Sequence, residues 1–260
     1  MKLTVLNVIN ILFFVKFAMI LLEYLYSKYK NDSIYNTEIT LNNTINGIVL
    51  NLVSPRFYTF YFLLFIQIYN FLHIEINTEF NWLTFTICLL FVDFMYYVFH
   101  RLHHSVAFFW SLHSVHHSDT KLNLSTAMRI SWLEQVYLFL FFLPIVLAGF
   151  HPLTIFLAFY VLVEYQFYCH SQYLKLPKIL EYILVTPSNH RVHHDQEERH
   201  QTNNFGGVFS IWDRLLGTYT RSEQLTNFVP GISDFKENNF VKYQFLPVIK
   251  YIKTILRYKV

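Results

Sequence analysis

The stretch WLTFTICLLFVDFMYYVFHRLHH, residues 82–104, joins a long apolar run directly to three histidines. The apolar part, residues 82–99, has a length and composition suited to a helix that crosses the hydrocarbon layer of a bilayer. His100, His103 and His104 follow without a break. We therefore predict a membrane helix whose end presents imidazole side chains to a metal.

The same histidine pattern occurs three times in the chain. Each copy is a histidine followed three and four residues later by two more, at residues 100–104, 113–117 and 190–194. Offsets of three and four fall on one face of a helix, so each copy can aim its imidazoles at a common point. The chain has 13 histidines in 260 residues, a content at which chance would produce roughly 0.03 copies. Because imidazole suits iron, zinc and copper, three copies indicate a metal site.

The composition places this metal site at a membrane. Hydrophobic residues make up 54% of the chain and charged residues only 14%, against about a quarter in soluble domains. We predict an all-α integral membrane bundle of four or five transmembrane helices in a single domain, 1–260. The candidate spans are residues 3–26, 57–72, 82–99, 132–149 and 152–168. Membrane segments are expected over 1–81, a histidine-rich core over 82–220 and an interfacial amphipathic tail over 221–260.

The distribution of positive charge predicts which side the histidines face. Lysine and arginine lie between the first and second apolar stretches, between the third and fourth, and after the fifth. The links 75–81 and 150–151 carry none. The positive-inside rule then makes the first set of segments cytoplasmic, and all three histidine motifs fall on that side as a helical cap. The net charge of +3 gives no indication of nucleic-acid binding.

Motifs for other cofactors do not occur in the sequence. Cys88 and Cys169 form no zinc-ribbon or iron–sulfur pattern, and neither G-x-G-x-x-G nor a P-loop is present. Any redox cofactor other than the metal is therefore expected to come from outside the chain.

Two further polar residues are predicted to lie near the metal. Asp93 falls on the same helical face as His100. A carboxylate in an apolar span needs a partner, and we expect either the far N–H of a ligating imidazole or the hydroxyl of Tyr96 or Tyr97. His170 follows the fifth apolar stretch at the expected depth of the three motifs, which makes it a candidate ligand.

An ordered set of motifs over residues 93–219 resembles the fatty acid hydroxylase/sterol desaturase superfamily. The set consists of DxxYYxxHRxxH from residue 93, HxxHHS from residue 113, TPSNHRVHH from residue 186 and WDRLLGT from residue 212. Within the superfamily, NLSTAMR at 123–129, YQF at 165–167 and GGV at 206–208 are most similar to the alkylglycerol monooxygenase branch and its bacterial relatives.

The resemblance implies a membrane-bound, non-haem di-iron oxygenase that uses O2 and external electrons to oxidise a C–H bond of a lipid. Hydroxylation, desaturation and ether cleavage all remain open. Two Fe ions per chain are implied, with zinc able to replace them in a purified sample, and the partners are a lipid substrate, the bilayer and an electron donor. The ligands carried over by motif position are His100, His104, His113, His116, His117, His190, His193 and His194, with His170 as a ninth. His103 falls outside the spacing of the family's first motif.

Other residues are expected to act around the metals. Asp93 and Asp213 would orient ligands, and Asn189, at a position often occupied by histidine in these relatives, would donate a hydrogen bond or hold a water molecule. Arg129 would contact a lipid head group or a site carboxylate, or would simply flank the membrane.

Two other classes of protein stay open at this point. One is a membrane metal-binding or metal-transport protein without oxygenase activity, although transporters place their ligands near the bilayer midplane, whereas these histidines follow the ends of spans. The other is an inactive scaffold that keeps a structural metal.

Overall fold

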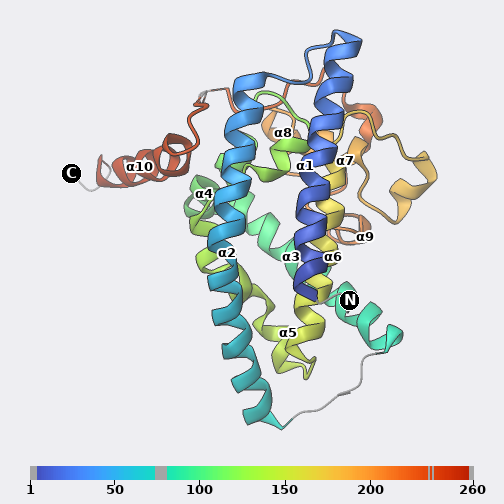
Figure 1. The fold of residues 1–260 in the computed structure, drawn as a ribbon, viewed down its shortest axis with the longest axis vertical. Coiled ribbons are helices and arrows are strands. Elements are labelled where there is room, and N and C mark those ends of the chain that lie inside the picture. The colour runs from blue at the N-terminus through green and yellow to red at the C-terminus, as the bar shows by residue number, and fades with distance from the viewer. Residues whose placement is uncertain (1–4, 74–80, 234, 236, 258–260) are drawn as a thin grey trace.

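The computed structural model describes residues 5–73, 81–233, 235 and 237–257. Within these residues the chain is built of helices and contains isolated β-bridges but no strand. The longest helices are α1 (Val5–Lys30), α2 (Thr37–Leu72), α3 (Trp82–Ser105) and α6 (Pro152–Cys169). Figure 1 shows α1 and α2 running along the long axis of the molecule. The predicted all-α bundle is confirmed.

Among the residues that the structure describes, three helices have the length and composition to cross a membrane, namely α2, α3 and α6. A shorter apolar helical segment covers Leu138–Leu147. The predicted helical membrane bundle is thus confirmed, with three candidate spans among the described residues where four or five were predicted. Helix α2 begins at Thr37, 20 residues before the apolar stretch predicted to start at residue 57. Its first turn is fixed by Asn36, whose side chain accepts a hydrogen bond from the Ile39 amide.

Residues 132–149, predicted as a single span, form a broken path instead. It consists of η2 (Leu133–Val136), η3 (Leu138–Phe142) and α5 (Leu143–Leu147). Two buried polar side chains explain the break, because each needs a partner inside the protein. Gln135 accepts hydrogen bonds from Ser54 and Tyr58 of α2, and Glu134 lies 3.3 Å from an imidazole nitrogen of His113.

The first apolar helix packs against the bundle through polar contacts. In α1, Lys16 forms a 2.7 Å ion pair with Glu164 of α6. The buried Glu23 carboxylate accepts hydrogen bonds from the Tyr35 hydroxyl and the Leu124 amide. These two charges therefore have partners within the protein, as an apolar environment requires.

The hydrophobic core lies where α2, α3, α6 and the broken segment meet. Phe65, Val92, Phe139 and Ile155 are fully buried members of it. The turn before α6 has Gly149 in the left-handed region, at φ 89°, which favours glycine. This hairpin returns the chain to the end of α3 and so brings the later motifs towards the first.

Short helices carry the remaining motifs. The second motif ends α4 (Ala107–His117), and the third lies in and just after α7 (Pro187–His193). The other elements are η1 (Leu124–Met128), η4 (Lys178–Tyr182), α8 (Glu198–Gln201), α9 (Ile211–Leu215), η5 (Ser222–Gln224) and α10 (Lys242–Arg257). In Figure 1, α10 projects from one side of the bundle. Its exposed apolar side chains include Ile249 and Ile252. The interfacial tail stays a prediction, and link 75–81 lies outside the described residues except for Asn81.

Candidate metal centre

Nine histidine side chains form two adjoining clusters that could each hold a metal ion. Cluster A consists of His100, His104, His113, His117 and His193, and cluster B of His116, His170, His190 and His194. Within each cluster the candidate ring nitrogens all lie within 4.8 Å of one another. The clusters meet where the His117 and His194 rings stack, with centroids 4.5 Å apart. The fold thus brings together all nine histidines predicted as ligands.

Each cluster draws histidines from more than one motif. In every motif the two histidines four residues apart belong to the same cluster. In the second and third motifs the histidine at offset three belongs to the other cluster, so His116 joins B and His193 joins A. Offsets of three and four fall on either side of a helical turn of 3.6 residues. Neighbouring rings on one helix can therefore diverge towards two metal ions.

Five buried Nε2 atoms of cluster A lack hydrogen-bond partners among the described residues, as does the Nδ1 atom of His117. The five Nε2 atoms belong to His100, His104, His113, His117 and His193. Buried polar atoms are nearly always paired in native proteins, and each unpaired one costs about 1–3 kcal/mol. Five such atoms facing one another fit the coordination of a cation.

Cluster B shows a chain of close imidazole contacts. The Nε2 atoms of His116 and His170 are 3.1 Å apart, as are those of His170 and His190 and those of His190 and His194. Two neutral imidazoles can share one proton in such a contact, but four converging nitrogens cannot all be satisfied in this way. This donor set also fits a metal ion, and nitrogen-rich sites suit iron, copper and zinc.

Four of the nine cluster rings are oriented by backbone acceptors at their Nδ1 atoms. The Nδ1 atoms donate to backbone carbonyl oxygens in four cases: His100 to Phe205 at 2.9 Å, His116 to Arg129 at 3.1 Å, His170 to Gln166 at 2.7 Å and His193 to Asn203 at 2.8 Å. A carbonyl oxygen can only accept, so Nδ1 carries the proton and the Nε2 lone pair is left for a metal.

Burial keeps the imidazoles of the clusters neutral at physiological pH. Loss of solvent lowers the pKa of His193 to about 3 and that of His116 to about 4. Burial also raises the pKa of the Glu134 carboxyl, which adjoins His113, to about 7. Neutral imidazoles are the form that binds metals.

His103 has a different environment from its neighbours in the first motif. Its Nδ1 donates to the Phe99 carbonyl oxygen at 2.7 Å, and its Nε2 lies 2.7 Å from the Tyr137 hydroxyl. Both nitrogens are engaged, and His103 belongs to neither cluster.

A separate group of possible metal ligands consists of Asp195, Glu197 and His200. It contains a 2.8 Å contact between the Asp195 carboxylate and the His200 Nδ1.

Both partners expected for Asp93 are wrong: among the described residues, its carboxylate hydrogen-bonds neither to an imidazole nor to the hydroxyl of Tyr96 or Tyr97. Its carboxylate accepts hydrogen bonds from the Val208 amide at 2.6 Å, the Phe209 amide at 3.1 Å and the Trp212 indole at 2.9 Å. The physical reason is that the loop before α9 brings two backbone donors, and α9 itself brings the Trp212 indole, to the buried face of α3. Asp93 thus anchors the loop whose Phe205 carbonyl holds His100.

Asn189 and Asp213 position backbone segments beside the clusters. Asn189 forms a reciprocal cap with Thr186 at the start of α7, and its amide nitrogen lies 3.3 Å from the Tyr219 hydroxyl. Asp213 accepts hydrogen bonds from the amides of Phe205 and Gly206, both at 2.8 Å. Neither side chain hydrogen-bonds to a cluster histidine in the described part of the chain, so any influence on the ligands passes through the backbone.

Arg129 is a buried structural residue, so its predicted roles as a membrane-flanking cation or a head-group contact are wrong. Its side chain has no solvent exposure. The guanidinium donates to the Val115 carbonyl oxygen, the Ser118 hydroxyl and the Glu237 carbonyl oxygen, and lies 3.8 Å from the centroid of the Tyr243 ring. Val115 and Ser118 lie at the end of α4, so the Arg129 side chain points into the protein there. The backbone carbonyl oxygen of Arg129 also accepts from the His116 Nδ1 and orients that ring.

Sequence reasoning missed the acceptors that orient the rings. Four are backbone carbonyls, which leave no sequence signal. Glu134 did carry a signal, because a carboxylate inside an apolar stretch needs a partner, and its partner is His113.

Comparison with known proteins identifies the family. Residues 85–218 match the family model of the fatty acid hydroxylases. The chain belongs to the fatty acid hydroxylase family. The matched segment contains all nine cluster histidines, from His100 to His194.

Several curated relatives of this member of the fatty acid hydroxylase family have names that refer to lipids. It is 35% identical to alkylglycerol monooxygenase of Caenorhabditis elegans over 71% of this chain and 37% of that protein. It is 43% identical to the human alkylglycerol monooxygenase over 49% of this chain and 28% of that protein. An ornithine lipid hydroxylase of Rhizobium tropici is 31% identical over 50% of this chain and 40% of that protein. The matches thus span less than half the length of these relatives. No solved structure gave a significant match.

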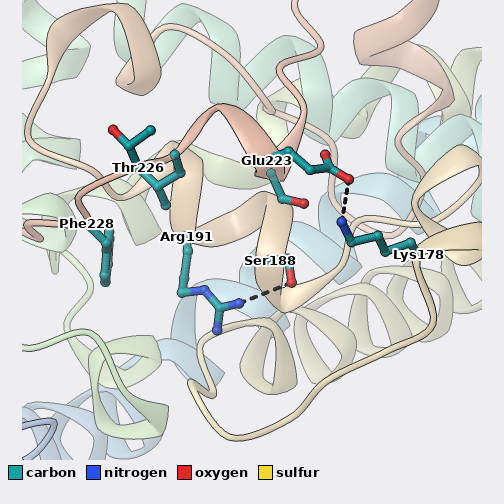
Figure 2. A pocket seen from close by; sticks show the side chains of 8 residues that line it. Lys178, Ser188, Arg191, Glu223, Thr226 and Phe228 are labelled. Carbon is teal, nitrogen blue, oxygen red and sulfur yellow. Dashed lines mark hydrogen bonds and ion pairs between the residues drawn. The ribbon is translucent and has the colours of Figure 1, made fainter.

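Two cavities of the protein lie near the helices that carry histidines. The larger, of about 310 Å³, is lined by residues that include Ser188 and Arg191 of α7 together with Lys178, Glu223 and Thr226, but by no cluster histidine. Figure 2 shows Lys178 paired with Glu223 across it, and Arg191 bonded to Ser188. The smaller, of about 210 Å³, is lined by Arg101, His104, Ser105, Thr202, Phe205 and Thr218. Only the smaller cavity reaches a cluster.

Proposed function

We propose that this chain is a membrane-bound di-iron oxygenase that oxidises a C–H bond of a lipid, with clusters A and B each holding one iron ion. The observation that carries the proposal is the set of five unpaired Nε2 atoms in cluster A beside the converging Nε2 atoms of cluster B. Membership of the fatty acid hydroxylase family supports the lipid substrate.

The metals would supply the oxidising chemistry, since iron held by imidazoles can activate O2 for attack on an unactivated C–H bond. The protein's own contribution is to position and shield. Backbone carbonyls hold the rings of His100, His116 and His193 in the required tautomer. Eight of the nine cluster side chains are buried, which keeps bulk water from the centre.

An alkylglycerol is the first substrate to test, because two of the matched relatives carry that word in their names. Insertion of one oxygen atom, as in hydroxylation, is the outcome that the words monooxygenase and hydroxylase in the relatives' names favour. We place the histidine centre on the cytoplasmic side, from the distribution of lysine and arginine. Electrons would arrive there from an external donor.

The experiment is an assay of the purified chain loaded anaerobically with iron. We expect O2 uptake that depends on both a reductant and an alkylglycerol, together with a product that has gained one oxygen atom or lost its ether bond. A matched variant, His117→Ala, should abolish this uptake. Two bound metals with no lipid-dependent oxidation across alkylglycerols, fatty acids and sterols would instead favour a metal-binding protein.

A further inference from the structure

His104 is the one cluster histidine that is not buried. The other eight cluster histidines are buried, whereas His104 is partly exposed and lines the smaller cavity. A reactant that approaches the centre through the described residues therefore meets cluster A at His104. The Phe205 ring forms one wall of this route and lies 5.3 Å from the His104 ring and 5.6 Å from the His100 ring, measured between centroids.

We propose that the smaller cavity is the entrance through which the reacting segment of the lipid reaches cluster A. This inference rests on the proposed function. The cavity lining includes Ser105, the last residue of α3, and the next residues of the chain include the exposed apolar side chains Val106 and Phe108. Exposed aliphatic and aromatic groups at the end of a membrane helix suit the bilayer surface, which makes a lipid the occupant that this position favours.

The size of the cavity limits what can enter. Its volume of about 210 Å³ is below the roughly 300–1,000 Å³ of pockets that enclose a whole drug-sized ligand. A lipid would therefore place only a short segment beside His104 and leave the remainder outside.

A polar network holds the rim of the entrance. The Arg101 guanidinium donates to the Tyr97 hydroxyl at 3.1 Å, and that hydroxyl lies 3.0 Å from the Thr218 hydroxyl. Thr218 in turn donates to Asp213 at 2.8 Å. Arg101 is exposed, so its remaining N–H groups can bind the hydroxyl or phosphate oxygens of a lipid head group that stays outside.

Thiol labelling tests the entrance without relying on turnover. Thr202 lies exposed at the rim, while Thr226 lines the larger cavity and gives a matched control. The two native cysteines are buried, so Thr202→Cys and Thr226→Cys each add a single accessible thiol. We expect a saturating alkylglycerol, added under anaerobic conditions, to slow maleimide labelling of T202C by at least tenfold and to leave T226C unchanged.

A second pair of variants links occupancy to reaction. Thr202→Trp should lower kcat/KM for the alkylglycerol at least tenfold while keeping the wild-type metal content, and Thr226→Trp should stay within twofold of wild type. The inference is overturned if the lipid fails to protect T202C although the wild-type enzyme oxidises it, or if T202W turns over normally. Protection of T202C by the lipid, combined with a wild-type enzyme that oxidises no lipid, would overturn the proposed function alone.

Discussion

His116 and His117 are neighbours in the chain, yet they belong to different clusters. Their ring planes are nearly perpendicular, at 88°, with centroids 5.6 Å apart. His117 joins cluster A, and His116 lies 3.1 Å from His170 in cluster B. One turn of α4 therefore connects the two candidate metal sites, and a substitution at either position is expected to affect one site more than the other.

Replacing either neighbour should remove one metal. We expect His117→Ala and His116→Ala each to lower the metal content of the purified protein from about two to about one per chain, since each removes a ligand from only one cluster. The matched control is His103→Ala, which should keep both metals because the His103 nitrogens are engaged with Phe99 and Tyr137. Elemental analysis measures the ratio. Loss of a metal in H103A would contradict the assignment of ligands.

Removing the metals should destabilise the fold. A metal present at 1,000 times its dissociation constant stabilises the native state by about 4 kcal/mol, which corresponds to a fall in Tm of about 10 °C on chelation for a chain of this size. The cause is the return of unpaired ring nitrogens in cluster A. Thermal unfolding in detergent, with and without a chelator, measures the shift. An unchanged Tm after verified metal loss would argue against this account.

Asp93→Asn should loosen the loop that supports His100. The native carboxylate accepts hydrogen bonds from three donors. In the variant, the amide nitrogen that replaces one carboxylate oxygen would point at an N–H group, and that N–H group would lose its acceptor. That mismatch costs about 1–3 kcal/mol, and we also expect weaker iron binding. Denaturation and metal titration measure the two effects. Glu197→Gln, at an exposed position, serves as the control, and equal behaviour of the two variants would refute the anchoring role of Asp93.

Asp213 should give the chain a specific dependence on pH. Burial raises the pKa of its carboxyl to about 6 from the ordinary 3.8. Protonation of Asp213 therefore contributes to the free energy of unfolding. This contribution is fully present below about pH 3.8 and is lost as the pH rises through about 6. Relative to Asp213→Asn, the metal-free wild type should gain about 1.4 kcal/mol between pH 7.5 and 5. Denaturant midpoints at each pH test this, and a constant difference between the two proteins would rule it out.

The sequence allowed the fold class and the gathering of the histidines to be predicted, because apolar length and histidine spacing are local properties of the chain. Contacts between distant segments were harder to predict. Asp93 and Val208 are 115 residues apart, and the donors that Asp93 meets are backbone amides with no sequence signature. Arg129 was misread for a related reason: a cation between apolar stretches usually faces water, and only the packing of α2, α4 and the C-terminal segment encloses this one.

The number of tightly bound iron ions per chain tests the central claim most directly. Anaerobic titration of the purified, metal-free protein with Fe²⁺, followed by gel filtration and elemental analysis, gives this number. Two equivalents in the wild type, with one in each of H116A and H117A, is the result that two histidine clusters predict. One equivalent or fewer in the wild type would contradict the di-iron centre.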